Sequence, residues 1–232
     1  MFINGFDILW DEVDDYVADI QSIRSIDQFT FNKPVTFFCG ENGSGKSTLL
    51  EALAIKNGLN PEGGTRNYNF STYDSYSDLH NHIRLWRSRK PDWMYFLRAE
   101  SFYNVATKEM EYSGVFSERY HDQSHGQSFF SVLMKQTNKN GLYLLDEPEA
   151  ALSCQNQLAL LYLIQSCVKQ NCQFIIATHS PILLGFPGAQ ILSFDEGKVE
   201  EVNYKSTSSY QTMKLFLNRY DYFVEDIKEN DN

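Results

Sequence analysis

Short, mostly apolar runs recur along the chain and predict buried β-strands. Each run is four or five residues long, which is too short for an ordinary helix. The clearest runs are residues 35–39, 93–97, 142–145 and 173–177. Because these runs are apolar without strict alternation, they indicate a sheet that is covered on both faces.

Helical patterns separate these strands. Residues 48–55 contain no helix breaker, and residues 153–170 predict a long helix. The apolar face of the long helix is formed by Leu158, Leu161, Ile164 and Val168. Residues 78–90 predict another helix, which begins at an Asp78 cap and ends before Pro91. Buried strands that alternate with helices indicate an α/β fold with a mostly parallel sheet flanked by helices.

The remaining segments complete this plan. Residues 1–34 predict an antiparallel β-region with a short acidic helix-like stretch. Residues 191–202 predict a hairpin at a sheet edge, and residues 209–228 predict a helical C-terminus. We therefore expect a single domain over residues 1–232, with a small helical lobe inserted at about residues 78–140.

One motif carries most of the functional prediction. Residues 40–48 form a complete phosphate-binding loop of the pattern G-x-x-x-x-G-K-[ST], between a predicted strand and a predicted helix. Its residues are Gly40, Glu41, Asn42, Gly43, Ser44, Gly45, Lys46, Ser47 and Thr48. The glycines allow backbone N–H groups to converge on an anion, and the helix N-terminus adds its dipole. Lys46 is expected to reach the β- and γ-phosphates, and Ser47 to offer its hydroxyl to Mg²⁺.

Two further strands end in residues with catalytic chemistry. The strand at 142–145 is followed by Asp146 and Glu147, and carboxylates beside a buried strand are costly unless they bind a cation or a donor. We expect Asp146 to support Mg²⁺ and Glu147 to polarise the attacking water. His179 follows the strand at 173–177 and is a candidate contact of the γ-phosphate or of that water.

Together these residues resemble the ABC-type ATPases, a group of P-loop NTPases. That family also carries a Ser-x-Gly-[Gln/Glu] signature before its Asp-Glu strand, and this chain has Ser124, Gly126 and Gln127 at that place. The resemblance implies that Ser124 and Gly126 touch the γ-phosphate held by an opposite subunit. It therefore implies ATP and Mg²⁺ as cofactors and a homodimer in the ATP state.

More narrowly, the chain looks like the compact stand-alone AAA family ATPases that are related to RecF-like and SMC-like heads. The chain departs from the family pattern at two places. The loop Asp that follows the catalytic Glu in the family is Ser153 here, and no Gln stands at the end of the 93–98 strand. Glu100 is the candidate substitute for the Mg²⁺-sensing Gln, and a structural salt bridge is the alternative role for Glu100.

Composition and charge restrict the possible partners. The 232 residues carry a net charge of −10. If this charge were spread evenly, the surface would repel nucleic acid and anionic membranes. We find no apolar run long enough to span a membrane, no signal-peptide pattern and no metal-type spacing of the four cysteines, so we expect a cytoplasmic protein with reduced thiols. The one basic cluster is Arg84, Arg87, Arg89 and Lys90. It is either a solvated helix face or a docking patch for nucleic acid or a partner protein.

The function expected from these observations is ATP hydrolysis coupled to nucleotide-dependent homodimerisation. A protein or nucleic-acid transaction of the repair or defence type is favoured as the process driven, because only 77 residues separate Lys46 from Ser124 and no heptad arms follow. The alternatives are an ATP-binding subunit of a transport complex and a nucleotide switch without hydrolysis. A small-molecule kinase would leave the Asp-Glu and Ser-x-Gly-Gln segments unexplained.

Overall fold

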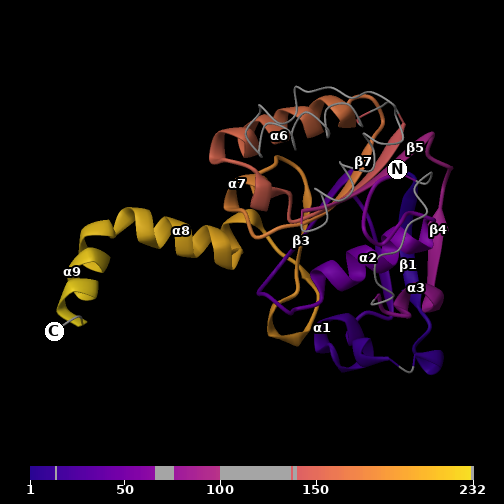
Figure 1. Cartoon of the computed structure of the whole chain (residues 1–232), viewed down its shortest axis with the longest axis horizontal. Coiled ribbons are helices and arrows are strands. Elements are labelled where there is room, and N and C mark those ends of the chain that lie inside the picture. The colour runs from indigo at the N-terminus through magenta and orange to yellow at the C-terminus, as the bar shows by residue number, and fades with distance from the viewer. Residues whose placement is uncertain (14, 66–75, 100–136, 138–139, 231–232) are drawn as a thin grey trace, which may run out of the picture.

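A six-stranded sheet forms the centre of the protein (Figure 1). The structure, a computed structural model, describes residues 1–13, 15–65, 76–99, 137 and 140–230. The strand order is β5-β6-β7-β3-β8-β9, with all neighbours parallel except the antiparallel pair β8–β9. The strands are β3 (Val35–Cys39), β5 (Trp93–Arg98), β6 (Gly141–Asp146), β7 (Gln173–Ala177), β8 (Gln190–Ser193) and β9 (Glu200–Glu201). The predicted parallel sheet and its edge hairpin are therefore confirmed.

Helices cover both faces of this sheet. On one face α2 (Lys46–Lys56) packs its leucines against Phe38 and Leu144. On the other face α6 (Cys154–Val168) and the short α7 (Pro181–Leu184) cover Phe37 and Tyr143. Neighbouring residues of one strand thus enter opposite cores, which explains why these strands are apolar throughout.

A second, smaller sheet contains the predicted N-terminal β-region and one strand from further along the chain. Its strand order is β2-β1-β4, and both pairs are antiparallel. The strands are β1 (Ile3–Ile8), β2 (Gln28–Thr30) and β4 (Ile83–Arg87). Between β1 and β2 lie two 3₁₀ turns, η1 (Trp10–Glu12) and η2 (Tyr16–Asp19), and the one-turn helix α1 (Gln21–Arg24).

The helix predicted over residues 78–90 is wrong. The helical part, α3 (Leu79–His82), is a single turn, and the chain then extends as β4. Pairing with β1 explains the change, since Ile83 lies opposite Ile8 and Leu85 opposite Phe6, and both contribute to the core under the small sheet. The apolar residues at positions 79 and 83 have the spacing of a helix. The local pattern could not reveal the strand, because the partner residue of Ile83 in β1, Ile8, is 75 residues away in the sequence.

The apolar face of α6 also differs from the prediction. Leu158 is 49% exposed, whereas Leu160 and Ile164 are fully buried and Leu161 is partly buried. The buried stripe includes Gln157 and Cys167, two residues that the hydrophobic pattern did not select.

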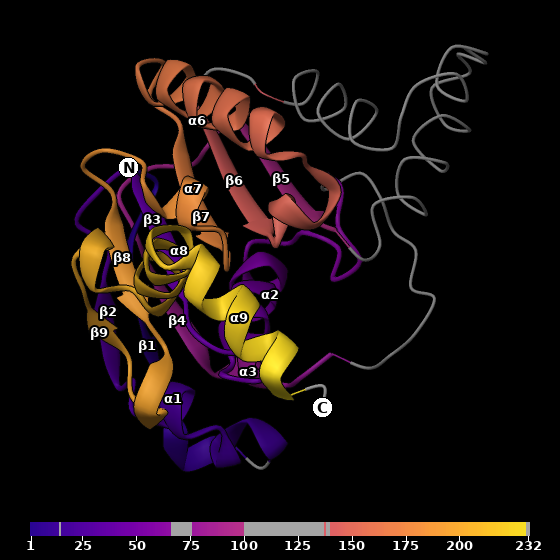
Figure 2. The same ribbon diagram turned by 90° about the vertical axis from the view of Figure 1, so that its left-hand side faces the viewer.

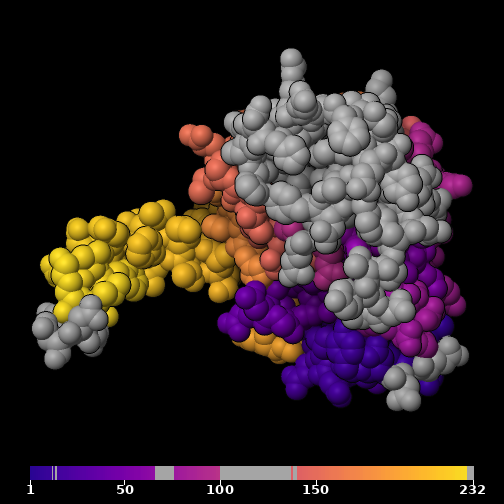
Figure 3. All heavy atoms as spheres, viewed as in Figure 1, coloured from indigo at the N-terminus to yellow at the C-terminus, as the bar shows by residue number. Residues whose placement is uncertain are grey.

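The C-terminal residues form two helices that project from the body, α8 (Ser208–Asn218) and α9 (Tyr220–Asn230) (Figures 1 and 3). The prediction had one helical stretch here, but Arg219 has non-helical dihedrals and separates the two. Residues 208–230 are called the arm below. The connection from β9 contains the 3₁₀ turn η6 (Tyr204–Ser206).

Most of the predicted lobe at about residues 78–140 lies outside the described residues.

All four cysteines, Cys39, Cys154, Cys167 and Cys172, carry free thiols, in agreement with the prediction. Within the described ranges, no helix is long and apolar enough to cross a membrane.

Candidate functional site

The phosphate loop joins β3 to α2, as its sequence predicted. Helix α2 begins at Lys46 after Gly45, which has a left-handed conformation (φ 93°), and no side chain caps its first turn. By contrast, α6 is capped by Ser153, whose hydroxyl accepts a hydrogen bond from the N–H of Asn156. The first N–H groups of α2 are therefore free of any side-chain cap, as an anion-binding helix N-terminus requires. Ser153, which stands where the resemblance expects an Asp, is thus the N-cap of α6.

Two glycines of the loop differ in how closely the rest of the protein packs against them. At Gly43 (φ 77°) a Cβ atom would meet nothing within 4 Å, so the loop is open there. At Gly45 a Cβ atom would lie 2.8 Å from the side chain of Ile23, a residue of α1. The loop is thus packed against α1 on one side and accessible on the other, and the hydroxyl of Ser22 donates to the Ser44 carbonyl from the packed side.

We predict different costs for the same substitution at these two glycines. Gly43→Ala should destabilise the protein by about 1 kcal/mol, through its positive φ alone. Gly45→Ala should cost roughly 2–4 kcal/mol, because overpacking against Ile23 is added to the same backbone strain. Urea unfolding of the two variants measures the difference, and equal losses would contradict this packing of the loop on α1.

Lys46 lies across the loop. Its Nζ donates to the carbonyls of Gly40 (2.9 Å) and Glu41 (2.7 Å), and its residue is 3% exposed. Burial lowers the pKa of Lys46, while the nearby carboxylates of Glu147 and Asp195 oppose that shift. A buried cation held by loop carbonyls is well placed to exchange those contacts for phosphate oxygens.

Ser47 and Asp146 meet at the other end of the loop. The Ser47 hydroxyl donates to Oδ1 of Asp146 at 2.8 Å, and Asp146 is 6% exposed. A hydroxyl and a carboxylate are oxygen donors of the kind Mg²⁺ prefers, and Mg²⁺ in phosphate sites commonly takes only one or two protein ligands. These two residues therefore fit the predicted magnesium site.

Arg98 links this pair to helix α2. It is the last residue of β5, opposite Asp146 in the sheet, with its Nε 3.6 Å from Oδ2 of Asp146. Its Nη1 forms an ion pair with Glu51, which is one turn beyond Ser47 on α2. Burial raises the pKa of Glu51, and the Arg98 charge opposes that shift. The arginine thus holds two carboxylates from two different elements, a role that the sequence did not reveal.

We predict that Arg98→Met destabilises the protein by roughly 2–3 kcal/mol, because it leaves the carboxylate of Glu51 buried without its partner. The double variant Arg98→Met/Glu51→Met should recover more than half of that loss. Denaturant unfolding of the two single variants and the double variant gives the coupling. Losses that simply add would mean that the ion pair contributes nothing.

Glu147 and His179 face each other beyond the magnesium pair. Strand β7 (Gln173–Ala177) lies between β3 and β6 in the sheet, so the turn after β7 that carries His179 falls between the phosphate loop and the end of β6. Nε2 of His179 lies 3.5 Å from Oε1 of Glu147. Glu147 is a non-glycine residue with positive φ (47°), a conformation that costs energy and recurs at functional sites. Its side chain is 41% exposed, so water can reach it.

Two positioning residues were missed by the sequence analysis. Glu149 accepts hydrogen bonds from the N–H groups of His179 (2.6 Å) and Ser180 (3.2 Å) and so fixes the turn that carries His179. Asp195, just after β8, accepts from the N–H of Glu41 at 2.9 Å and so fixes the entry to the phosphate loop. Both contacts join segments at least 30 residues apart, and no local pattern signals them.

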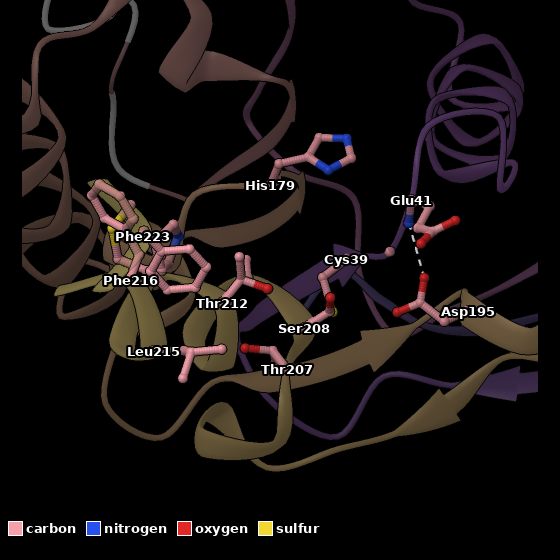
Figure 4. A pocket seen from close by; sticks show the side chains of 14 residues that line it. Cys39, Glu41, His179, Asp195, Thr207, Ser208, Thr212, Leu215, Phe216 and Phe223 are labelled. Atoms are coloured by element: carbon pink, nitrogen blue, oxygen red, sulfur yellow. Dashed lines mark hydrogen bonds between the residues drawn. The ribbon is translucent and has the colours of Figure 1, made fainter. Parts of the chain in front are cut away.

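A cavity of about 550 Å³ adjoins the loop on the side of His179 (Figure 4). The polar residues Glu41, Asp195 and His179 stand on one side of it, and Phe216 and Phe223 of the arm stand on the other. Burial raises the pKa of the Cys39 thiol in its wall to about 12, so this cysteine is not a nucleophile at neutral pH. A second, more polar cavity of about 840 Å³ includes Asn42 and Gly43.

Several predicted site residues are not tested. Ser124, Gly126, Gln127 and Glu100 lie outside the described residues, so the signature and the candidate Mg²⁺-sensing residue remain predictions. Thr48 is described and lies half-buried in the first turn of α2.

The basic cluster is held by neighbouring groups. Arg84 pairs with Asp7, and Arg87 donates to the side-chain oxygen of Asn57. Arg89 lies over the ring of Phe2, 4.5 Å from its centroid. Three of the four side chains thus have partners within the fold, which favours the interpretation as an ordinary surface. Arg84 and Arg87 lie on strand β4, and Arg89 and Lys90 follow it, so the cluster does not form the expected helix face.

Comparison with known proteins gives matches in two parts of the chain. Residues 18–82 match an AAA domain, and residues 125–184 match an AAA ATPase domain. An uncharacterized ABC transporter ATP-binding protein of Haemophilus influenzae is 28% identical over 196 residues, which cover 73% of each chain.

Solved structures show more distant similarity. For cbiO1 from Clostridium perfringens, part of the ABC transporter complex cbiONQ, the identity is 18% and the TM-score 0.48, over 97% of this chain and 100% of that one. A nucleotide-free ATP-binding cassette from an ABC transporter gives 16% and 0.45, over 87% and 91%. The two domain matches agree with the phosphate loop, the strand-end carboxylates and the histidine placed between them, and together they support the resemblance to an ABC-type P-loop ATPase.

Proposed function

We propose that the chain binds Mg-ATP, dimerises around it and hydrolyses it. Lys46 and the N–H groups of the loop bind the β- and γ-phosphates. Ser47 and Asp146 hold Mg²⁺, which neutralises charge on the phosphate oxygens when bound. Ser124, Gly126 and Gln127 of a second copy cap the γ-phosphate, as the family resemblance implies.

Hydrolysis is assigned to Glu147. Its carboxylate accepts a proton from the attacking water, and His179 lies beside it to contact the γ-phosphate or the same water. The observation that carries this proposal is the distance of 3.5 Å between Oε1 of Glu147 and Nε2 of His179. This pair accompanies the hydrogen bond from Ser47 to Asp146. The proximity of these four side chains at one edge of the sheet supports the assignment of the general base and the metal ligands.

Phosphate release from ATP by the purified chain tests the proposal. We expect release that stops when EDTA removes Mg²⁺. The variant Asp146→Asn should need at least about tenfold more Mg²⁺ for half-maximal release, because it loses a carboxylate ligand. ATP binding without any release would instead support a nucleotide switch, and release that is insensitive to EDTA would contradict the assigned magnesium pair.

A second proposal concerns the process that ATP drives. The relative from Haemophilus influenzae is named as an ABC transporter ATP-binding protein, which favours a transport subunit over the repair or defence role. We therefore propose a transport complex as the second candidate function, and we propose no nucleic-acid partner. Fractionation of cells that express the chain at its native level tests it. A transport subunit should sediment in part with membranes, and its complete recovery in the supernatant would argue against this role.

A further inference from the structure

The arm presents apolar side chains that no part of the described body covers. Helix α8 touches η6 and α7 at its root, yet none of its residues is buried (Figures 2 and 3). Large apolar side chains that are 42–67% exposed are Met213, Leu215, Phe216, Leu217, Tyr220, Tyr222 and Ile227. Helices of 11 residues are marginal in water without tertiary packing. The arm therefore needs a surface to pack against.

The charges of the arm are divided between its two ends. The root, residues 208–219, contains two basic residues and no acidic one: Lys214 and Arg219. The tip, residues 220–230, contains four acidic residues and one basic one: Asp221, Glu225, Asp226 and Glu229, with Lys228. The root is thus positive and the tip negative, within a chain that is acidic overall.

We propose that the arms of two copies pair antiparallel, root against tip, when two copies close around Mg-ATP. A twofold dimer uses the same surface on both subunits, so each root meets the other tip and both contacts join opposite charges. A parallel pairing would place like charges together. The inference rests on the proposed nucleotide-dependent dimer, and it adds the surface that holds the two copies.

The position of the root supports a second copy as the occupant. Ser208, Thr212 and Met213 of the arm line the same cavity as Gly40 and His179 (Figure 4). The arm thus leaves the body at the edge where the γ-phosphate would be capped by the other subunit. An anionic membrane is a poorer partner, because the tip is acidic.

Charge reversal tests the pairing. In a Glu147→Gln background with Mg-ATP, we expect Lys214→Glu/Arg219→Glu to raise the dimer Kd at least about tenfold, and Asp221→Lys/Asp226→Lys to do the same. An equimolar mixture of the two should regain the parent Kd, since each altered root then meets an oppositely charged tip. Analytical ultracentrifugation measures the Kd. Lys90→Glu/Lys169→Glu changes the net charge by the same amount as the root variant, away from the arm, and should have no effect.

The outcomes separate this inference from the proposed function. Binding of a fluorescent ATP analogue by the monomers should not change in any arm variant. If the parent dimerises with Mg-ATP but ignores both charge reversals, or if the mixture stays as weak as its components, only the arm pairing is overturned. If the parent never dimerises, both proposals fail. Sedimentation with phosphatidylcholine vesicles that is lost in Leu217→Ser would assign the arm to a membrane and also overturn the pairing.

Discussion

Replacing Glu147 with glutamine should reduce phosphate release by about 10²–10⁴-fold while ATP still binds. Glutamine has the same shape but cannot accept a proton from water, and the change leaves Lys46, Ser47 and Asp146 in place. Because release is blocked after binding, the ATP-bound dimer should accumulate. Steady-state phosphate release and the mass of the protein with Mg-ATP measure the two effects.

Glu149→Gln is the matched control on the same turn. The side-chain oxygen of this glutamine can still accept the N–H groups of His179 and Ser180, so we expect less than about a tenfold loss of release. If Glu147→Gln keeps wild-type turnover, or if the Glu149 variant loses as much activity, Glu147 is not the general base.

Lys46→Ala should weaken ATP binding by about 100-fold, because two charge-assisted hydrogen bonds to phosphate are worth roughly 1.5 kcal/mol each. In the described structure this charge is held by the carbonyls of Gly40 and Glu41, which release it to a phosphate at the cost of two hydrogen bonds. Isothermal titration with ATP measures the affinity.

Lys56→Ala is the control at the other end of the same helix. Its Nζ donates only at 3.4 Å to the carbonyl of Asn81, in an exposed position, so nucleotide affinity should not change. Equal affinities of wild type and Lys46→Ala would mean that the loop does not hold the triphosphate through this lysine.

Local sequence patterns predicted the centre of the site and of the sheet. The loop from Gly40 to Thr48, the carboxylates Asp146 and Glu147, and His179 each follow a buried strand, and the parallel register brings all three strand ends to one edge. The placement of these residues was predictable because the glycine spacing and the apolar runs encode the local structure within a few residues.

The missed features depend on distant contacts. Residues 83–87 form a strand because they pair with β1. Leu158 is exposed because packing against the sheet determines which face of α6 is buried. Glu149 and Asp195 act through backbone N–H groups of remote segments, so their roles have no sequence signature. The opposite charges of the root and the tip can be read from the sequence. Only the structure shows that these residues project from the body, where a partner can contact them.

The central claim is that a triphosphate lies between the loop of one copy and the Ser124 segment of another. Mixing two inactive variants tests it most directly. Lys46→Ala removes the loop charge and Ser124→Arg blocks the cap, so each should fail alone to release phosphate. A heterodimer of the two keeps one intact composite site, and random pairing in an equimolar mixture should restore about a quarter of wild-type release, since half of the dimers then carry one working site of two. Full activity of Ser124→Arg alone, or a mixture as inactive as its components, would contradict a site shared between two copies.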